Sequence, residues 1–231
     1  IIVSNQTSNQ TINIIKKNIF HNNSKKIICN EQFICSENEN GFIYYEDEIG
    51  GLKLPKSNLI GEFQIENIAT AIATLRSLKL QIEDGHINNG ITKIKSVARL
   101  QEINNGRIKD LCKNNKIFID GSHNPLGAKV LNKYLESLNC NKHIILGMMS
   151  NKDHNEYMNY FKNITSLTTI DIPNQPNAIK GKELKQKLNK FPNINYKESI
   201  QDAIKSISAS NNDIILITGS LYLAGEVLNL N

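Results

Sequence analysis

From Arg99 onward, short apolar segments alternate with amphipathic segments of helical periodicity, and this alternation constrains the fold more than any other feature of the sequence. Strands are expected at RLQEI, KIFID, HIILGM, LTTIDI and DIILIT. Most of them precede a segment with helical spacing, namely PLGAKVLNKYLESL, NEYMNYFKNI, GKELKQKLNKF, IQDAIKSISA or GSLYLAGEVLNL. Such alternation is typical of an α/β fold with a mostly parallel sheet that is covered by helices on both faces.

The first part of the chain follows a different pattern. A strand is expected at IIVSN, a helix in TINIIKKNIFHN, a strand at KKIICN, and a hairpin in QFICSENENGFIYYED with Gly41 at its turn. Apolar residues at helical spacing predict two further helices, over residues 61–78 and 82–94. Because the pattern changes within KIKSVAR, we predict two domains, residues 1–95 and residues 96–231, joined at that segment.

Composition and charge narrow the class of protein. The net charge of +5 comes from scattered lysines and three arginines among 231 residues, unlike the clustered charge of a nucleic-acid-binding stripe. The four cysteines include no C-x-x-C pair and no histidine at zinc spacing, so free thiols and no metal site are expected. No apolar run approaches the roughly 18 residues that cross a bilayer, and the N-terminal residues lack signal-peptide features. We therefore expect a cytoplasmic protein.

The stretch IDGSHNPLGAK crowds polar side chains into the turn between a strand and a helix. Asn124 and Pro125 are expected to be the N-cap and first residue of that helix. Ligands of open α/β sheets bind at the carboxyl ends of the strands, which makes Asp120 and His123 candidate ligand contacts. For Asp120 alone, a carboxylate that only accepts hydrogen bonds from nearby loop amides is an equally good interpretation.

Two other turns follow strands in the same way. In TGSLYLAGEV, Ser220 is expected to cap a helix whose exposed amides would also suit a carboxylate or phosphate. In GMMSNKDH, residues 152–154 are expected to form a solvated charged loop. Neither a G-x-x-x-x-G-K-[ST] motif nor a G-x-G-x-x-G motif occurs, so glycines alone predict no nucleotide site.

Five segments, taken together and in this order, resemble the folylpolyglutamate synthase and dihydrofolate synthase family of the Mur-ligase superfamily: GEFQIENIATAIATL, VARLQEI, IDGSHNPLGAKVL, GMMSNKD and GSLYLAGEV. They span nearly the whole chain but match the later part of such an enzyme. The resemblance implies that residues 1–95 are the C-terminal part of the central ATPase domain. It implies that residues 96–231 are the Rossmann-like C-terminal domain, the glutamate-ligase domain, and that the P-loop and magnesium ligands precede Ile1.

The activity implied by the resemblance is the ATP-dependent addition of L-glutamate to a folate or dihydropteroate carboxylate through an acyl phosphate. The cofactors would be ATP and Mg²⁺, and the partners would be small molecules only, with a monomeric intact enzyme. The chain by itself is expected to be inactive, because phosphoryl transfer needs a phosphate cradle and a metal. Whether the enzyme adds the first glutamate, later glutamates or both is left open.

The resemblance also assigns individual residues. Asn67, Arg99 and Asp120 match the family's ATP contacts, as an amide for adenine, a guanidinium for phosphate and a carboxylate for ribose hydroxyls. His123 and Ser220 match positions near the incoming glutamate and the acyl phosphate, and His123 is the expected catalytic residue. No metal ligand is expected within residues 1–231.

The sequence departs from the family pattern at two places, and two other classes of protein compete with this interpretation. The family's proline-glycine pair before the arginine is Val97-Ala98 here, which affects the predicted hinge, and Phe63 stands where histidine is commoner. A Ser-His-Asp hydrolase is a competing class, although Ser122 and His123 are adjacent, so their side chains should point apart, and no G-x-S-x-G elbow is present. A non-catalytic nucleotide-binding or partner module derived from such a ligase is the second alternative.

Overall fold

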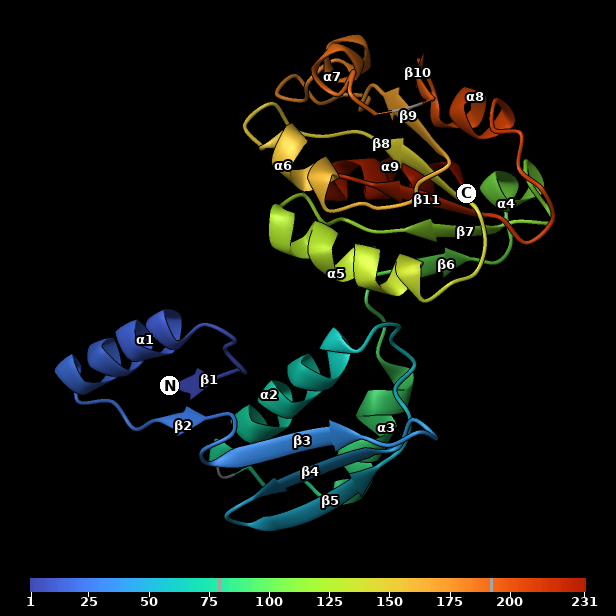
Figure 1. The fold of residues 1–231 in the computed structure, drawn as a ribbon. Coiled ribbons are helices and arrows are strands. Elements are labelled where there is room, and N and C mark those ends of the chain that lie inside the picture. The colour runs from blue at the N-terminus through green and yellow to red at the C-terminus, as the bar shows by residue number, and fades with distance from the viewer. Residues whose placement is uncertain (79, 192) are drawn as a thin grey trace. The chain divides into compact units, whose positions relative to one another are not determined.

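The computed structural model describes residues 1–78, 80–191 and 193–231, and the chain divides into two compact units, Ile1–Lys95 and Ser96–Asn231 (Figure 1). Each unit has its own sheet structure and its own hydrophobic core, and each is described by itself. None of the helices in the described ranges is long and apolar enough to cross a membrane.

The described residues of the first unit form two small sheets and three helices. A parallel pair is joined by a helix, in the order β1 (Ile2–Val3), α1 (Asn9–His21) and β2 (Ile27–Ile28). An antiparallel sheet follows, made of β3 (Phe33–Glu37), β4 (Ile43–Asp47) and β5 (Gly50–Leu54). Two helices complete the unit, α2 (Phe63–Ser77) and α3 (Asp84–Lys93). The predicted hairpin is confirmed, with Gly41 at a φ of 79° in its turn, whereas β5 was not predicted.

The core of this unit lies between the antiparallel sheet and its two helices. Helix α2 buries Ile68 and Ile72 one turn apart, as the apolar spacing predicts. These side chains share one cluster with Ile87 of α3 and with the stacked rings of Phe33 and Tyr45. Packing of this sheet against α2 and α3 is what gives residues 1–95 an independent core.

The second unit is built on a six-stranded sheet in the order β10-β9-β8-β11-β7-β6. Its strands are β6 (Gln101–Ile103), β7 (Lys116–Ile119), β8 (Lys142–Leu146), β9 (Ser166–Ile170), β10 (Ile194–Lys197) and β11 (Ile214–Thr218). All neighbours pair in parallel except β6, which is antiparallel to β7. The predicted α/β class with a mostly parallel sheet is confirmed.

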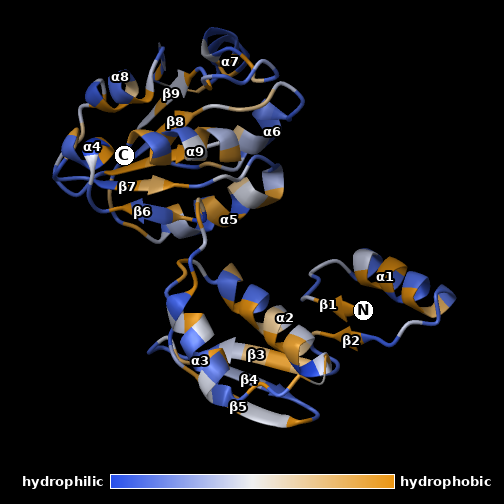
Figure 2. Ribbon diagram, turned by 180° about the vertical axis from the view of Figure 1, so that it is seen from behind, coloured by the Kyte–Doolittle hydropathy of each residue, from blue (hydrophilic) through white to orange (hydrophobic). Residues whose placement is uncertain are grey.

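Helices cover both faces of this sheet, as two views from opposite sides show (Figures 1 and 2). They are α4 (Arg107–Asp110), α5 (Pro125–Glu136), α6 (His154–Asn159), α7 (Gly181–Lys187), α8 (Ile200–Lys205) and α9 (Leu221–Leu230). Ile117 and Ile119 of β7 join the cluster that includes α8 and α9, whereas Phe118 meets Tyr134 of α5 on the opposite face. Burial on both faces explains why β8 and β11 are buried at every position.

Two short elements of this unit were not predicted. Strand β10 has the sequence INYK and is only half-buried, because it lies at the edge of the sheet, so it lacks the apolar run that reveals a central strand. Helix α4 is a single turn of four residues, too short for a periodic pattern.

Candidate functional site

Three turns meet at the carboxyl ends of the adjacent strands β7, β11 and β8. The amide of Asp120 donates to the carbonyl of Ile217 at 3.0 Å, and the amide of Gly147 donates to the carbonyl of Thr218 at 3.2 Å. Gly219 has a φ of 107°, and a Cβ there would lie 2.6 Å from the Gly147 carbonyl oxygen. The turns therefore pack backbone against backbone, at the edge of the sheet where α/β proteins bind ligands.

Asp120 is the charged centre of the turn after β7. It is 3% exposed, and its Oδ2 accepts a hydrogen bond from the amide of Leu100 while its Oδ1 accepts one from the amide of Ser122, both at 2.8 Å. A third bond runs from the Gly121 amide to the Ala98 carbonyl at 2.9 Å. Asp120 thus fastens the segment before β6 to this turn, which is the bracing role that the sequence left open.

Arg99 is held in that segment by its two neighbours. Ala98 and Leu100 are buried and have φ values of 54° and 47°, in the left-handed region that favours glycine. Their burial and the bond from Leu100 to Asp120 hold this backbone in place and leave the Arg99 side chain exposed. The left-handed conformation at Ala98 gives a physical reason for the glycine that the resembling family carries at this position.

His123 and Ser122 turn to different partners, as their adjacency predicts. The Nδ1 atom of His123 lies 3.0 Å from the Gly121 carbonyl oxygen. Because a carbonyl oxygen only accepts hydrogen bonds, this contact puts a proton on Nδ1, so that in the neutral tautomer Nε2 is the atom that can accept a proton. The Ser122 hydroxyl lies instead 3.2 Å from the hydroxyl of Tyr157.

Tyr157 of α6 is a residue of this site that the sequence analysis missed. Its side chain is 0% exposed, and its hydroxyl lies 2.8 Å from Oγ1 of Thr218 as well as near Ser122. Burial raises the pKa of Tyr157 well above its ordinary value, so the hydroxyl is neutral. One phenol therefore joins the turn that carries His123 to the strand end that precedes Ser220. In the sequence, Tyr157 lies in an amphipathic segment, and this pattern predicts only an aromatic residue of the core.

The helix caps at the site agree with the sequence, whereas part of the loop after β8 does not. Asn124 accepts from the Gly127 amide at 2.8 Å, and buried Ser220 accepts from the Tyr222 amide at 3.1 Å, which confirms both N-caps. The prediction of a solvated loop is wrong for His154, which is buried, with its Nε2 3.0 Å from the Met149 carbonyl. Asp153 is exposed and caps α6.

The predicted site residues fall into two groups. Asp120, His123 and Ser220 come together on the turns after β7 and β11, and Arg99 adjoins them through the bond between Leu100 and Asp120. Asn67 belongs to the other unit: it is exposed on α2, and its Nδ2 donates to Oε1 of Gln64 at 3.0 Å.

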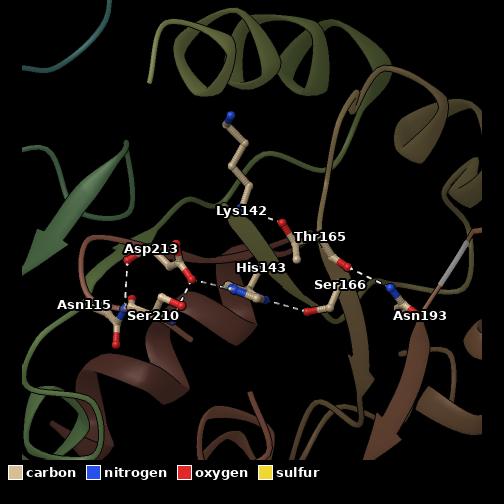
Figure 3. A network of polar contacts seen from close by, with 8 residues as sticks. All are labelled: Asn115, Lys142, His143, Thr165, Ser166, Asn193, Ser210 and Asp213. Atoms are coloured by element: carbon tan, nitrogen blue, oxygen red, sulfur yellow. Dashed lines mark hydrogen bonds and ion pairs between the residues drawn. The ribbon is translucent and has the colours of Figure 1, made fainter. Parts of the chain in front are cut away.

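A serine, a histidine and an aspartate do line up in the second unit, but at the amino ends of the strands (Figure 3). His143 Nδ1 lies 2.8 Å from the Ser166 hydroxyl, and His143 Nε2 lies 3.6 Å from Oδ2 of Asp213. The second distance is longer than a hydrogen bond, and the histidine and aspartate are 4% and 5% exposed. This geometry favours a buried packing network over a hydrolytic triad.

Asp213 anchors this network to the loop before β11. Burial alone would raise the pKa of its carboxyl, but hydrogen bonds from the amide of Ser210 and from Asn141, together with the nearby His143 ring, outweigh burial and lower that pKa. The side chain of Asn115 adds bonds to the carbonyls of Ser210 and Asp213, at 2.7 and 3.1 Å. The amino edge of the sheet is thus closed by polar contacts.

Metal and thiol chemistry find little support in the structure. In the described ranges, no three histidine, cysteine, aspartate or glutamate side chains gather in a way that could hold a metal ion. All four cysteines are free and half-buried, as expected, and burial raises the pKa of the Cys35 thiol to about 11. A thiol with a raised pKa is a poor nucleophile.

Comparison with known proteins agrees with this fold. The family described as Mur ligase, glutamate ligase domain matches residues 106–221. The chain is 29% identical to the folylpolyglutamate synthase of Lacticaseibacillus casei over 79% of its own length and 42% of that protein. It is 26% identical to the dihydrofolate synthase/folylpolyglutamate synthase of Bacillus subtilis, over 74% and 40% of the two chains.

Solved structures show the same architecture over both units. The folylpolyglutamate synthase of Mycobacterium tuberculosis complexed with ADP has a TM-score of 0.84, at 18% identity, over 99% of this chain and 54% of that one. The Escherichia coli FolC protein in complex with DHPP and ADP has a TM-score of 0.80, at 20% identity, over 99% and 52%. At these identities the likeness shows the fold.

Because the family match covers half of the 231 residues, this chain belongs to the Mur ligase family and contains its glutamate ligase domain. Within that family it is similar to folylpolyglutamate and dihydrofolate synthases. The chain spans about two fifths of the length of these curated relatives.

Proposed function

We propose that the protein containing this chain is an ATP-dependent ligase that adds L-glutamate to a folate or dihydropteroate carboxylate through an acyl phosphate. The observation that carries the proposal is the glutamate ligase domain itself, with Asp120, His123 and Ser220 gathered where its strands end. In this proposal residues 96–231 form the glutamate-ligase domain, and residues 1–95 are the C-terminal part of the central ATPase domain.

The nucleotide contacts are proposed for three residues. Asn67 would read adenine through its side-chain amide, the exposed Arg99 would approach phosphate, and Asp120 would accept ribose hydroxyls. Each oxygen of Asp120 already accepts one amide hydrogen bond, and a carboxylate oxygen can accept a second. Its near-complete burial means that a ribose would reach only the edge of this carboxylate.

The glutamate end of the reaction is proposed for His123 and Ser220. The amine of glutamate must lose a proton before it displaces phosphate from an acyl phosphate, and Nε2 of His123, whose Nδ1 contacts the Gly121 carbonyl, would take that proton. The Ser220 hydroxyl accepts from the Tyr222 amide, so its own hydrogen is free to bond a carboxylate at the start of α9.

Mg²⁺ is implied by the family, and a Yersinia pestis relative was solved with AMPPNP and a Mn ion. The described residues hold no cluster of metal-ligating side chains, so they do not fit this ion. We place the metal ligands of the intact ligase outside residues 1–231. The chain alone should then produce neither ADP nor a glutamylated product, and turnover above a mock-purified control would contradict this.

The decisive experiment uses the full protein that contains this chain, assayed with ATP, L-glutamate and either dihydropteroate or a reduced folate. His123→Gln should lower kcat by about 10² to 10⁴ because the proton acceptor is lost. His21→Gln, at the exposed end of α1, is the matched control and should leave kcat unchanged.

Two further variants separate the substrates. Ser220→Ala should weaken glutamate use, whereas Asp120→Asn should raise the apparent requirement for ATP, each by about one to two decades. Equal small effects of both variants on both substrates would show that these residues only brace the turns. A folded full-length protein that makes no product, yet binds ATP, would instead support a non-catalytic module derived from a ligase.

A further inference from the structure

A hollow of about 790 Å³ lies at the outer edge of the six-stranded sheet and is formed mainly by residues of α7 and β10. Figure 1 labels these two elements. Three lysines line it, Lys182, Lys185 and Lys197, together with the Tyr196 side chain. Its remaining described lining residues are uncharged, and most of them bear side-chain amides or a hydroxyl. We call this hollow the cationic groove. It lies on strand β10 and contains none of the candidate site residues.

Within the described residues no ion pair involves the three lysines of the cationic groove. Two carboxylates, Glu198 and Asp202, line a neighbouring hollow that Lys182 and Lys197 also line, but not the groove itself. Asp202 accepts a hydrogen bond from the Ser199 hydroxyl at 2.7 Å, and Glu198 is exposed. Two other carboxylates near the groove have partners of their own. Glu183 pairs with Lys187 at 3.2 Å, and Asp171 accepts hydrogen bonds from the Gly181 amide and the Tyr196 hydroxyl at 2.6 and 3.3 Å.

The charge is also held in place by packing. Tyr196 lies against Gly181, where an added Cβ would come within 2.7 Å of its ring. The Lys182 ammonium sits 5.5 Å from the centre of the Tyr196 ring, in the range of a cation–π contact. Lys185 is half-buried on the same helix. A ligand in the groove would therefore meet cations that are partly ordered before it binds.

The backbone beneath these cations is the open side of an edge strand. The carbonyls of Asn193 and Asn195 face β9, where they accept from the Leu167 amide at 3.4 Å and the Thr169 hydroxyl at 3.2 Å. Because successive residues of a strand direct their backbone groups to opposite sides, Ile194 and Tyr196 direct theirs away from the sheet. Those groups form a short template for pairing with another extended segment.

We propose that the β10 edge binds an extended acidic peptide segment of a partner protein, which adds a strand to the sheet. The backbone of the peptide would pair with Ile194 and Tyr196, and its carboxylates would lie against Lys182, Lys185 and Lys197. Lysines on an edge strand also prevent self-association, since a second copy would bring like charges together. The same charges therefore disfavour a second copy of this chain and favour an acidic strand.

The test uses the 231-residue chain and a fluorescein-labelled eight-residue peptide in which glutamate alternates with threonine. Fluorescence anisotropy at about 0.15 M salt should give saturable binding, because Lys185 and Lys197 are half-buried and salt screens partly buried charges less than exposed ones. The double variant Lys182→Glu/Lys185→Glu should weaken binding at least tenfold. The double variant Lys93→Glu/Lys113→Glu, at exposed lysines that do not line the groove, has the same net charge and should change the affinity less than twofold.

Three further probes define the ligand. A peptide of the same charge with proline at alternate positions should bind at least tenfold more weakly, because proline cannot pair as a strand. A lysine–threonine peptide should not bind. Each of three results would overturn the proposal. The proline peptide could bind as tightly as the acidic peptide, or a single-stranded oligonucleotide could bind as tightly or more tightly. The third is that the acidic peptide shows no saturable binding at about 1 mM. Circular dichroism of each variant confirms that it is folded.

Discussion

Replacing Tyr157 by phenylalanine tests the packing of the candidate site directly. The substitution removes one oxygen atom and keeps the buried ring, which is tilted against Phe161 at a centroid distance of 5.4 Å. The hydroxyls of Ser122 and Thr218 would each lose a partner in a region that water does not reach. The effect on stability therefore reports the hydrogen bonds between two turns, with little change in volume.

The expected loss follows from the two bonds. An ordinary buried hydrogen bond contributes about 1 kcal/mol net, and a partner left unsatisfied adds to the loss. Two effects reduce this loss of stability: the two orphaned hydroxyls can rotate toward other acceptors, and phenylalanine costs less to desolvate than tyrosine. We expect Tyr157→Phe to lower the free energy of unfolding of the second unit by about 2 kcal/mol.

Urea unfolding is monitored by hydrogen exchange and mass spectrometry of peptides from β7 and β11. The stability of the second unit is thereby measured separately from that of residues 1–95. Tyr160→Phe is the matched control, because Tyr160 is half-buried at the end of the same helix, and its loss should stay below about 0.5 kcal/mol. The variant Ser122→Ala/Tyr157→Phe should lose less than the sum of the single variants. A loss for Tyr157→Phe no larger than that of the control would refute the bridging role.

Three other tests, which use four substitutions, follow from the same structure. Asp120→Asn should cost about 1.5 to 3 kcal/mol in thermal unfolding, because one oxygen that accepts an amide becomes a donor; an unchanged melting temperature would contradict this. Gly219→Ala should destabilise by about 2 kcal/mol or more, since φ is 107° and the Cβ meets a backbone oxygen, whereas Gly225→Ala, within α9 and with open space, should stabilise by about 0.5 to 1 kcal/mol. Asp213 has a lowered pKa when folded, so its stabilisation is complete above the ordinary carboxyl range and is lost as the pH falls through the folded pKa. Between about pH 5 and pH 2 the native chain should therefore lose more stability than Asp213→Asn, and parallel pH profiles would show that Asp213 does not contribute.

The parts of the fold that the sequence predicts are those whose physical cause is local. Strands β8 and β11 are apolar at nearly every position because they are buried on both faces, and that run is visible in the letters alone. The caps Asn124 and Ser220 act on amides two or three residues away, so their position beside a strand end is sufficient. The placement of Asp120 and His123 on a strand-end turn follows from the same rule.

The parts that the sequence does not predict depend on contacts between distant segments. The bond between Tyr157 and Thr218 joins residues 61 positions apart, and nothing in NEYMNYF distinguishes that tyrosine from a packing residue. His154 was expected in solvent because its neighbours are charged, but it is buried with its ring against a carbonyl. Strand β10 is stabilised by its register with β9 rather than by its own apolar content.

The position of β11 in the sheet has a consequence for the order in which the second unit can form. Strands β7 and β8 are neighbours along the chain, yet neither pairs with the other, because β11 lies between them. During synthesis on the ribosome, the other five strands of this sheet emerge before Ile214–Thr218, so the middle of the sheet at first has no strand to occupy it. The two halves, β6-β7 and β8-β9-β10, are joined only when Ile214–Thr218 inserts and bonds to both. Until then the apolar edges of β7 and β8 are open, so this unit depends on its last strand to protect it from aggregation.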